Sequence, residues 1–261
     1  MPNELFDLSG RVAIVTGGSR GLGRYLSRAL ARAGADMVIT SRNVADLRTT
    51  AEEIKSFGRK VFPCECDVRD YDSIQRMVES AHHEYGRIDI LVNNAGCNVR
   101  KRSLEVTWDD WNLVLDTNLR GSFFVAQAAA RHMVAARSGR IINIGCVTSV
   151  AGYAGLAPYG SSRGGVKQLT MSLAAEWGEH GVTVNCLAPG WFRTAQTAVL
   201  YEDQSWVAFV REDSAGPAGL SHRSHGAVVF LASDASHYVT GQTLLVDGGI
   251  SVGALRALPK E

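Results

Sequence analysis

The sequence predicts an α/β fold: a doubly wound, seven-stranded parallel sheet with helices on both faces. Two observations predict it. Short apolar runs rich in β-branched residues alternate along the chain with segments of helical periodicity, which is typical of parallel strands joined by crossover helices. A glycine-rich turn also leads from the first apolar run directly into the first helical segment. Because parallel sheets are covered on both faces, helices are expected on each side.

The elements follow from these patterns in chain order. Strands are expected at residues 12–16, 37–40, 61–66, 88–93, 141–145, 182–187 and 243–247. Helices are expected at residues 21–33, 44–57, 71–85, 107–136, 158–177 and 226–232. A glycine just past a helix favours a left-handed cap, because glycine has no Cβ to clash there. Five of the predicted helices are followed by such a residue: Gly34, Gly58, Gly86, Gly139 and Gly178.

Length and composition fit one soluble domain. A chain of 261 residues that is 46% hydrophobic can bury a full core, so a single dinucleotide-binding domain over residues 1–261 is expected. Residues 191–225 have the poorest periodicity and include Gly216-Pro217. Long loops in compact domains are usually functional, so we interpret this stretch as a substrate lid. The alternative is an irregular connection with one short helix.

Charge, cysteine content and hydropathy exclude several classes of partner. Lys and Arg number 27 against 26 Asp and Glu, so no broad surface for nucleic acid or membrane is expected, and the partner is a small molecule. No signal peptide or apolar run of membrane-spanning length is present, which favours a cytoplasmic location. Five cysteines at irregular spacing indicate reduced thiols, and Cys64 and Cys66 lack the second ligand pair of a metal site.

The glycine-rich turn has the chemistry of a phosphate site. It runs from Thr16 to Gly23, directly after the first strand, and carries glycine at positions 17, 18, 21 and 23. Glycine lets the backbone approach a pyrophosphate, and the N-terminus of the following helix offers unpaired N–H groups and a positive dipole end. A dinucleotide is therefore the expected ligand.

This turn, with the Asn-Asn-Ala-Gly run at 93–96, the Tyr159 and Arg163 pair and the Val-Asp-Gly-Gly run at 246–249, resembles the short-chain dehydrogenase/reductase family from about Leu8 to Gly249. The resemblance implies a Rossmann-like fold and hydride transfer between a nicotinamide and a carbonyl or secondary alcohol. It also implies these cofactor-binding residues: Gly17, Ser19, Arg20, Gly21, Leu22, Gly23, Ser41, Arg42, Asp67, Val68, Asn94, Ala95, Gly96, Tyr159, Arg163, Pro189, Gly190 and Thr194.

The end of the second strand predicts which nicotinamide cofactor binds. By the resemblance it lies beside the adenosine ribose, where an acidic residue would bind the 2′-hydroxyl of NAD; here the chain reads Ile-Thr-Ser-Arg-Asn at 39–43. Arg42, with Ser41 and with Arg20 of the turn, could instead surround a 2′-phosphate. NADP(H) is therefore expected. The alternative is two solvated arginines on a surface loop.

The catalytic residues match the family at two positions and depart from it at two. In the family a tyrosine is the acid/base, a lysine four residues on lowers its pKa, a serine orients the carbonyl, and an asparagine anchors a relay water. Tyr159 and Asn118 match, but Cys146 stands at the serine position and Arg163 at the lysine position. Arginine keeps the charge that can depress the pKa of Tyr159, whereas a thiol is a weak donor. Ser149 could substitute for it.

These departures leave three functional hypotheses. A weakened or specialised NADP(H)-dependent oxidoreductase is expected, because the tyrosine and asparagine are present. The alternatives are a catalytically impaired NADP(H)-binding sensor or scaffold, and a redox sensor built on a reactive thiolate at Cys146.

The resemblance also bears on substrate and assembly. The residues at 153–155 and 169–177 are similar to the gluconate 5-dehydrogenase and 3-oxoacyl-ACP reductase branches, which implies a keto-sugar acid such as 5-ketogluconate or a 3-oxoacyl thioester. Apolar walls at the expected mouth adjoin a loop at 97–102 with three basic residues, which suits an acidic group unless the loop is simply solvated. The wall residues are Thr148, Tyr153, Leu156, Trp191 and Phe192. The family pairs the helices carrying Asn118 and Tyr159 into homotetramers, and small residues at 126–130 would allow close helix contact.

Overall fold

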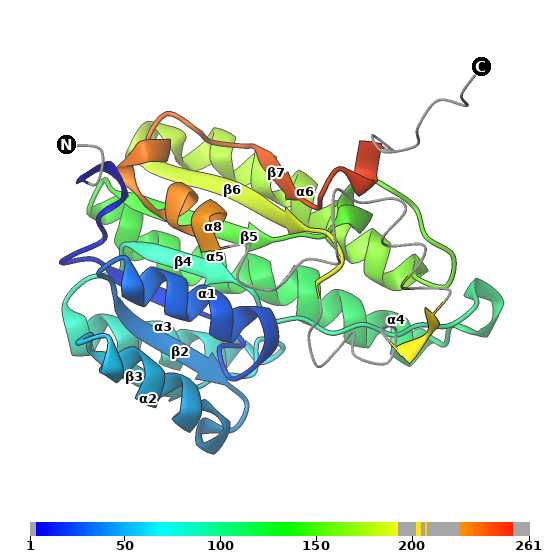
Figure 1. The fold of residues 1–261 in the computed structure, drawn as a ribbon, viewed down its shortest axis with the longest axis horizontal. Coiled ribbons are helices and arrows are strands. Elements are labelled where there is room, and N and C mark those ends of the chain that lie inside the picture. The colour runs from blue at the N-terminus through cyan, green and yellow to red at the C-terminus, as the bar shows by residue number, and fades with distance from the viewer. Residues whose placement is uncertain (1–3, 193–201, 205–206, 208–224, 253–261) are drawn as a thin grey trace.

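Seven parallel strands form one sheet in the order β3-β2-β1-β4-β5-β6-β7 (Figure 1). The computed structural model of the protein describes residues 4–192, 202–204, 207 and 225–252. The strands are β1 Val12–Val15, β2 Asp36–Ser41, β3 Val61–Glu65, β4 Ile90–Asn93, β5 Gly139–Ile144, β6 Val182–Pro189 and β7 Thr243–Val246. All seven expected strands are confirmed, with ends that differ by one or two residues.

Helices cover both faces of this sheet (Figure 1). They are α1 Gly21–Arg32, α2 Arg48–Ser56, α3 Tyr71–Tyr85, α4 Trp108–Leu115, α5 Gly121–Ala135, α6 Ala157–Trp177 and α8 His225–Ala232. Buried side chains of α3, α5 and α6 form one core, and those of α1, α2 and α8 form the other. The predicted doubly wound fold is therefore confirmed.

Alternation along the strands builds the two cores. Val12 and Ile14 of β1 pack into the core of α3, α5 and α6, whereas Ala13 and Val15 pack into the opposite core. Successive side chains of a strand point to opposite faces, so a strand buried on both faces must be apolar at every position. This requirement explains why the strands are continuous apolar runs in the sequence.

The strand order reverses beside β1, where the connection from β3 crosses to β4 on the other side. In open parallel sheets this switch leaves a crevice at the carboxyl ends of the strands, where ligands bind. The loops that follow β1, β2, β4, β5 and β6 carry most of the residues singled out in the sequence. The topology therefore brings these segments to one edge of the sheet.

Two of the five predicted helix caps were wrong. Gly34, Gly58 and Gly86 have φ of +111°, +73° and +71° and are left-handed as expected. Gly139, in contrast, already begins β5, and Gly178 is right-handed with φ of −59°. The left-handed residues of those connections are Arg137, with φ of 51°, and Gly181, with φ of 75°. A Cβ at Gly181 would overlap the Arg137 carbonyl oxygen, so the close approach of two backbones decides where the glycine is needed.

The helix expected at 107–136 is also divided. A π-helical segment, Asp116–Arg120, lies between α4 and α5. Such segments insert an extra residue into an α-helix and are frequent at functional sites. Asn118 is the middle residue of this segment, so the local widening sets the position of a predicted site residue.

The small residues at 126–130 do not form an outer surface. Ala126, Ala128, Ala129 and Ala130 are buried in the core between α5 and the sheet, so the close contact they allow is internal. No helix among the described residues is long and apolar enough to cross a membrane. All five cysteines are free thiols. Within the described part of the chain, no cluster of His, Cys, Asp and Glu has the make-up of a metal site.

Candidate active site

The glycine-rich turn after β1 is coiled so tightly that a side chain would not fit at Gly23. Gly17 and Gly21 have φ of +67° and +54°. A Cβ at Gly23 would overlap the Gly17 carbonyl oxygen and come within 2.5 Å of Asn94 Nδ2. The first turn of α1 contains no acidic residue, and Arg20 caps it without a side-chain hydrogen bond. The N–H groups at the start of α1 are thus directed at the crevice with no side chain competing for them.

Hydrogen bonds join this turn to the loop after β4. The Thr16 hydroxyl accepts the backbone N–H groups of Asn94 and Ala95, each at 3.0 Å. In return the Asn94 side-chain amide donates to the carbonyls of Thr16 at 2.9 Å and Gly17 at 3.2 Å. The Asn-Asn-Ala-Gly run therefore acts here as a brace that fixes the glycine-rich turn from the neighbouring strand.

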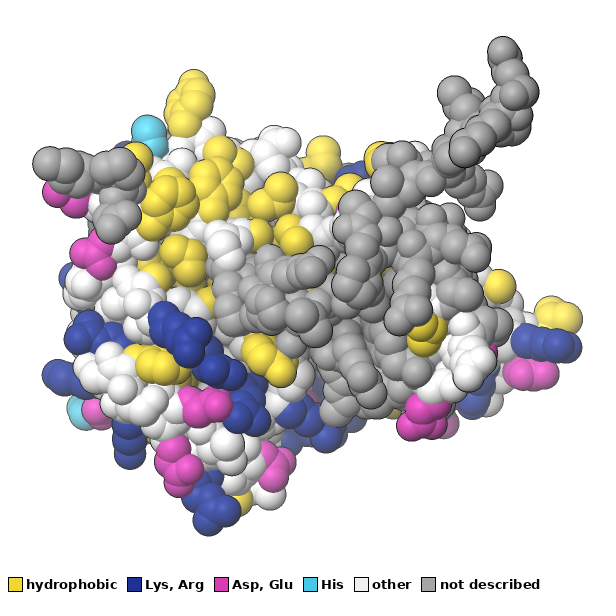
Figure 2. Space-filling model, in the orientation of Figure 1, with side chains coloured by type: hydrophobic (Ala, Val, Ile, Leu, Met, Phe, Trp, Pro, Cys, Tyr) yellow, Lys and Arg dark blue, Asp and Glu magenta, His cyan; other side chains and the backbone are white. Residues whose placement is uncertain are grey.

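The end of β2 lies beside the same turn. The Gly18 N–H donates to the Thr40 carbonyl at 2.9 Å, which places the segments carrying Arg20 and Arg42 next to each other. Both arginines are exposed, and within the described residues neither forms an ion pair. Figure 2 shows Lys and Arg side chains gathered over α1 and α2. The Ser41 hydroxyl is bonded locally to the backbone of Asn43.

Asp67, at the end of β3, is held by a neighbouring arginine. Arg69 donates to both carboxylate oxygens, at 3.1 and 2.7 Å, and its backbone N–H adds a third bond at 3.0 Å. The hydrogen bond from Arg69 keeps the pKa of Asp67 below its usual value, and the charge of Arg42 contributes. Asp67 therefore presents an ionised carboxylate at this edge. Val68 follows it and is buried against Gly121.

Tyr159 and Arg163 share one face of α6, as their spacing predicts. The guanidinium carbon of Arg163 lies 5.0 Å from the centroid of the Tyr159 ring. Its Nη1 donates to the Ile144 carbonyl at 2.7 Å. A Cβ at Gly96 would overlap Arg163 Nη2, so the glycine of the Asn-Asn-Ala-Gly run leaves room for the wider side chain. Arg163 thus fills the space between α6, the end of β5 and the loop after β4.

The pKa of Tyr159 differs from the expectation. Burial raises it to about 12, while the guanidinium of Arg163 acts to lower it and Cys146 raises it further. The arginine acts in the predicted direction, but desolvation outweighs its charge, so the net pKa lies above the usual value of a tyrosine. The phenol of Tyr159 therefore keeps its proton at neutral pH.

Asn118 is fully buried and held on both sides of its amide. The Cys97 N–H donates to Asn118 Oδ1 at 2.8 Å, and Asn118 Nδ2 donates to the Cys97 carbonyl at 2.9 Å and the Ser162 hydroxyl at 3.0 Å. The Ser162 hydroxyl donates in turn to the Tyr159 carbonyl at 2.7 Å. The π-helical segment is therefore tied to the loop after β4 and to the helix of Tyr159.

Cys146 and Ser149 lie in a short turn after β5. The Ser149 hydroxyl accepts the Cys146 N–H at 3.2 Å and donates to the Arg163 carbonyl at 2.9 Å. The hydroxyl proton of Ser149 is therefore already bound to backbone. This bond argues against the sequence-based suggestion that Ser149 substitutes for a serine at position 146.

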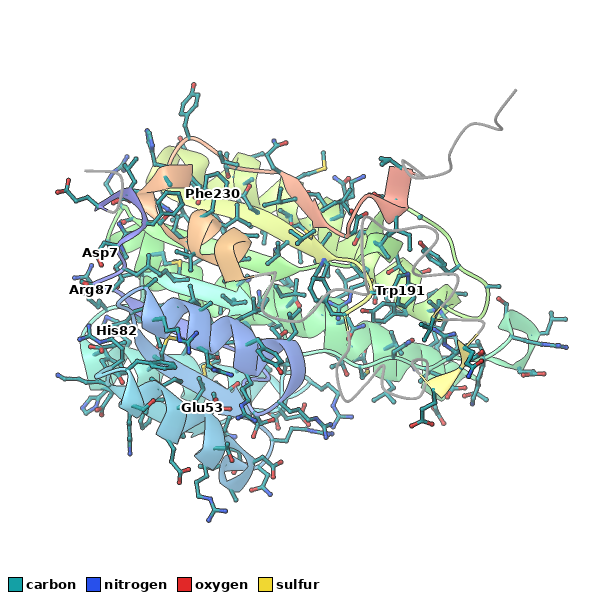
Figure 3. The ribbon with its side chains drawn as sticks, in the orientation of Figure 1. Asp7, Glu53, His82, Arg87, Trp191 and Phe230 are labelled. Carbon is teal, nitrogen blue, oxygen red and sulfur yellow. The ribbon has the colours of Figure 1, made fainter. Side chains whose placement is uncertain are left out.

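The wall of the site includes a residue that the sequence analysis missed. Ile250, after β7, packs in one cluster with Cys146 and Val147, against Tyr153, Tyr159 and Trp191. Trp191 lies just past the end of β6 (Figure 3), and its ring meets that of Tyr153 edge-on, with the two ring centroids 5.5 Å apart. Leu156 and Phe192 are buried. The signal for Ile250 was its place directly after the Val-Asp-Gly-Gly run.

Asp247 of that run positions the segment. Its carboxylate accepts the N–H groups of Gly249 at 2.9 Å and Ser251 at 3.0 Å. A Cβ at Gly190 would lie 2.7 Å from Asp247 Cα, so Pro189 and Gly190 pass directly beside it. Thr194, and most of the lid expected at 191–225, lie outside the described residues.

The basic loop at 97–102 lies beside the segment that precedes α6, since the Lys101 N–H donates to the Gly155 carbonyl at 3.2 Å. Lys101 Nζ pairs with Asp110 Oδ2 at 2.6 Å, so its charge is neutralised. A Cβ at Gly155 would lie 3.7 Å from Arg100 Cγ, which places Arg100 against the loop that precedes α6. Arg102 is exposed. Of the three basic residues, Lys101 is therefore the one whose charge is paired with Asp110, and Arg100 and Arg102 add positive charge to the same loop.

Comparison with known proteins gives consistent matches. The model of the family described as short chain dehydrogenase matches residues 11–205. The chain is 42% identical over 250 residues to gluconate 5-dehydrogenase of Gluconobacter oxydans (strain 621H), covering 95% of this chain and 98% of that protein. It is 40% identical to 2-dehydro-3-deoxy-D-gluconate 5-dehydrogenase of Escherichia coli (strain K12), covering 94% and 96%.

A solved structure is similar to this chain in both sequence and fold. The gluconate 5-dehydrogenase from Burkholderia cenocepacia J2315, in complex with NADP and tartrate, aligns with a TM-score of 0.94 at 39% identity and covers 97% of this chain and 99% of that one. The likeness extends over nearly the whole length of both chains.

Proposed function

Because the chain belongs to the short-chain dehydrogenase/reductase family and is an oxidoreductase of that type, we propose that it transfers hydride between NADP(H) and the carbonyl or secondary alcohol of a keto-sugar acid. The observation that carries this proposal is the contact of the half-buried Tyr159 with the buried Arg163, at the edge of the sheet where the glycine-rich turn lies. We also propose that residues 1–261 form one dinucleotide-binding domain.

The residues present fit NADP(H). The turn at Gly17 and Gly23 is a cradle that a Cβ would fill, which suits a pyrophosphate. Arg42, directly after β2, and Arg20, in the adjoining glycine-rich turn, supply exposed cations, and the residues at 40–43 include no acid to bind a free ribose hydroxyl. When bound, NADP(H) supplies the hydride. Its other proposed contacts are Ser19, Gly21, Leu22, Ser41, Asp67, Val68, Asn94, Ala95, Gly96, Tyr159, Arg163, Pro189, Gly190 and Thr194.

In the proposed mechanism, Tyr159 gives its proton to the carbonyl oxygen during reduction and takes it back during oxidation. Arg163 stabilises the phenolate that this transfer leaves, and its bond to Ile144 holds the end of β5 in register. Asn118 fixes the loop after β4 against α6. Cys146 lies against Tyr159 and contributes at most a weak hydrogen bond.

An acidic substrate is supported by the mouth and by the relatives. Arg100 and Arg102 lie on a loop beside the segment that precedes α6. The relatives named for gluconate and 2-dehydro-3-deoxy-D-gluconate act on sugar acids, and the Burkholderia structure holds tartrate, itself an acid. A 3-oxoacyl thioester is the competing class. Nothing in the geometry or the relatives favours the impaired sensor.

The experiment is to follow NADPH absorbance with purified protein and a panel of substrates. The panel contains 5-keto-D-gluconate, 2-dehydro-3-deoxy-D-gluconate with NADP⁺, a 3-oxoacyl thioester and simple ketones. We expect the highest kcat/KM for a sugar acid. A preference for the thioester would change the substrate class, and no turnover with any compound, despite measurable NADPH binding, would refute the proposed function.

The Arg42→Asp variant is expected to weaken NADPH binding by about 10- to 100-fold while leaving NADH binding within a few-fold, since it replaces a phosphate-binding cation by an anion. Fluorescence titration with each cofactor measures both. Arg76→Asp, an equally exposed change on α3, is the control. Equal losses for both cofactors in Arg42→Asp would contradict a 2′-phosphate contact.

The pH profile provides a further prediction. Tyr159 acts in reduction as a protonated group, and that form is lost as pH rises through a pKa of about 12. The kcat/KM of reduction is therefore expected to stay flat from about pH 6 to pH 9, whereas oxidation, which needs the phenolate, rises with pH. In Arg163→Met the rise should move to higher pH. A reduction rate that falls steeply near pH 7 would identify a different proton donor.

We further propose a homotetramer. Support comes from exposed apolar residues on the helices concerned, with Trp108 79% exposed and Met171 46% exposed, rather than from the buried alanines of α5. Light scattering after gel filtration measures the mass directly.

A further inference from the structure

The turn after β5 lacks an evident donor for the substrate carbonyl. The Cys146 thiol is a weak hydrogen-bond donor, and the Ser149 hydroxyl already donates to the Arg163 carbonyl. Hydride addition places negative charge on the carbonyl oxygen, and a fixed donor aimed at that oxygen accelerates the step. The polar side chain that remains in this turn is Thr148.

The Thr148 hydroxyl is buried and has no hydrogen-bond partner in the described part of the chain. The residue is 6% exposed, and its Oγ1 is fully enclosed. Two other buried threonines donate to backbone, Thr50 to the Gly18 carbonyl at 3.0 Å and Thr170 to that of Val166 at 2.8 Å, whereas Thr40 and Thr183 share the unpaired state of Thr148. An unpaired buried hydroxyl costs stability, and among these three threonines Thr148 is the one in the turn that packs against Tyr159, where a ligand could supply the missing partner.

The surroundings of Thr148 are those of the reacting centre. Val147 lies between Cys146 and Thr148 in the same short turn, and its side chain packs in one cluster with Tyr159. The Thr148 carbonyl lies 4.0 Å from where a Cβ of Gly160 would be, so the turn meets α6 one residue after Tyr159.

We propose that Thr148 donates a hydrogen bond to the reacting carbonyl oxygen of the substrate, taking the part that a serine at position 146 would play. This inference rests on the proposed oxidoreductase function. In reduction the carbonyl carbon gains hydride from NADPH, the oxygen gains the proton of Tyr159, and NADP⁺ is released. The Thr148 proton stays on its own oxygen throughout, so the residue stabilises charge and transfers nothing.

The first test makes the same substitution at two buried threonines, one in the turn after β5 and one at the opposite end of the sheet. Thr148→Val removes the hydroxyl and keeps the branched shape. Thr183→Val makes the same change at a second buried threonine whose Oγ1 also lacks a partner among the described residues, but which lies on β6 opposite Arg140, toward the amino end of the sheet. We expect kcat to fall by about 10²-fold in Thr148→Val and to stay within about twofold in Thr183→Val.

Two further measurements separate donation from mere packing. NADPH affinity should match that of the parent protein in both variants, and Tm should be equal or higher because an unpaired buried hydroxyl has been removed. Thr148→Ser, which restores a hydroxyl, should recover most of the lost kcat. In a Cys146→Ser background, Thr148→Val should cost no more than about tenfold, because the new hydroxyl offers the carbonyl a second donor. Equal kcat in Thr148→Val and Thr183→Val would overturn the inference, as would a loss that Thr148→Ser does not recover.

Failure of this inference is distinguishable from failure of the proposed function. If the parent protein turns over a sugar acid while Thr148→Val is unaffected, the function stands and the donor is elsewhere. If the parent turns over nothing but Cys146→Ser does, Thr148 does not act as the donor and the inference is overturned.

Discussion

Replacement of Tyr159 by phenylalanine is expected to lower kcat/KM by about 10³-fold, because proton transfer by a positioned acid contributes 10²- to 10⁴-fold to such reactions. The ring and its contact with Arg163 would remain, so the fold and NADPH affinity should change little. Steady-state kinetics with the best sugar acid of the panel, together with NADPH fluorescence titration, measures both quantities.

The control for this change is Tyr71→Phe, which removes a phenol from the exposed start of α3 and should leave the kinetics unaltered. A Tyr159→Phe protein that retains kcat within threefold of the parent would show that the proton comes from another group. A large loss of NADPH binding would instead show that the phenol mainly holds the cofactor.

The Gly23→Ala variant is expected to lose NADPH binding, with the Kd rising by about 100-fold or more. The added methyl would overlap the Gly17 carbonyl oxygen and crowd Asn94 Nδ2, so the turn must open. Overpacking of this kind costs roughly 1–3 kcal/mol, and here it also displaces the N–H groups that face the phosphates. Titration of NADPH fluorescence and thermal unfolding give the two readouts.

Gly178→Ala is the matched control, because Gly178 is right-handed and a Cβ there meets nothing within 4 Å. That variant should bind NADPH normally and be equally or slightly more stable. Normal NADPH binding by Gly23→Ala would mean that the turn does not hold the pyrophosphate in this conformation.

The fold could be predicted almost completely from the sequence, because strands buried on both faces must be continuous apolar runs and the helices between them keep their own period. The helix caps that were wrongly predicted at Gly139 and Gly178 show what the local sequence does not determine. Whether a connection turns at one residue or three residues later depends on contacts with distant segments, such as that between Gly181 and the Arg137 carbonyl.

At the candidate site, the element that carries each residue was predictable and the environment of its side chain was not. The spacing of Tyr159 and Arg163 placed them on one face of a helix, and their contact is present. The pKa of Tyr159 depends on burial by several segments, which no spacing reveals. The bond that occupies Ser149 and the arrival of Ile250 from beyond β7 likewise require the folded chain.

The hydrogen bond from Arg163 to the Ile144 carbonyl fixes the guanidinium beside Gly96, and it thereby restricts the order in which substitutions at positions 96 and 163 can be accepted. A lysine at position 163 carries its three N–H donors on one nitrogen, so it would lack the separate arms with which the guanidinium reaches the Ile144 carbonyl and lies over the tyrosine ring. A larger residue at position 96 would collide with the guanidinium, so it is tolerated after Arg163 has been shortened and not before. Mutational paths through these two positions are therefore directional, because position 163 has to change before position 96 can take a side chain.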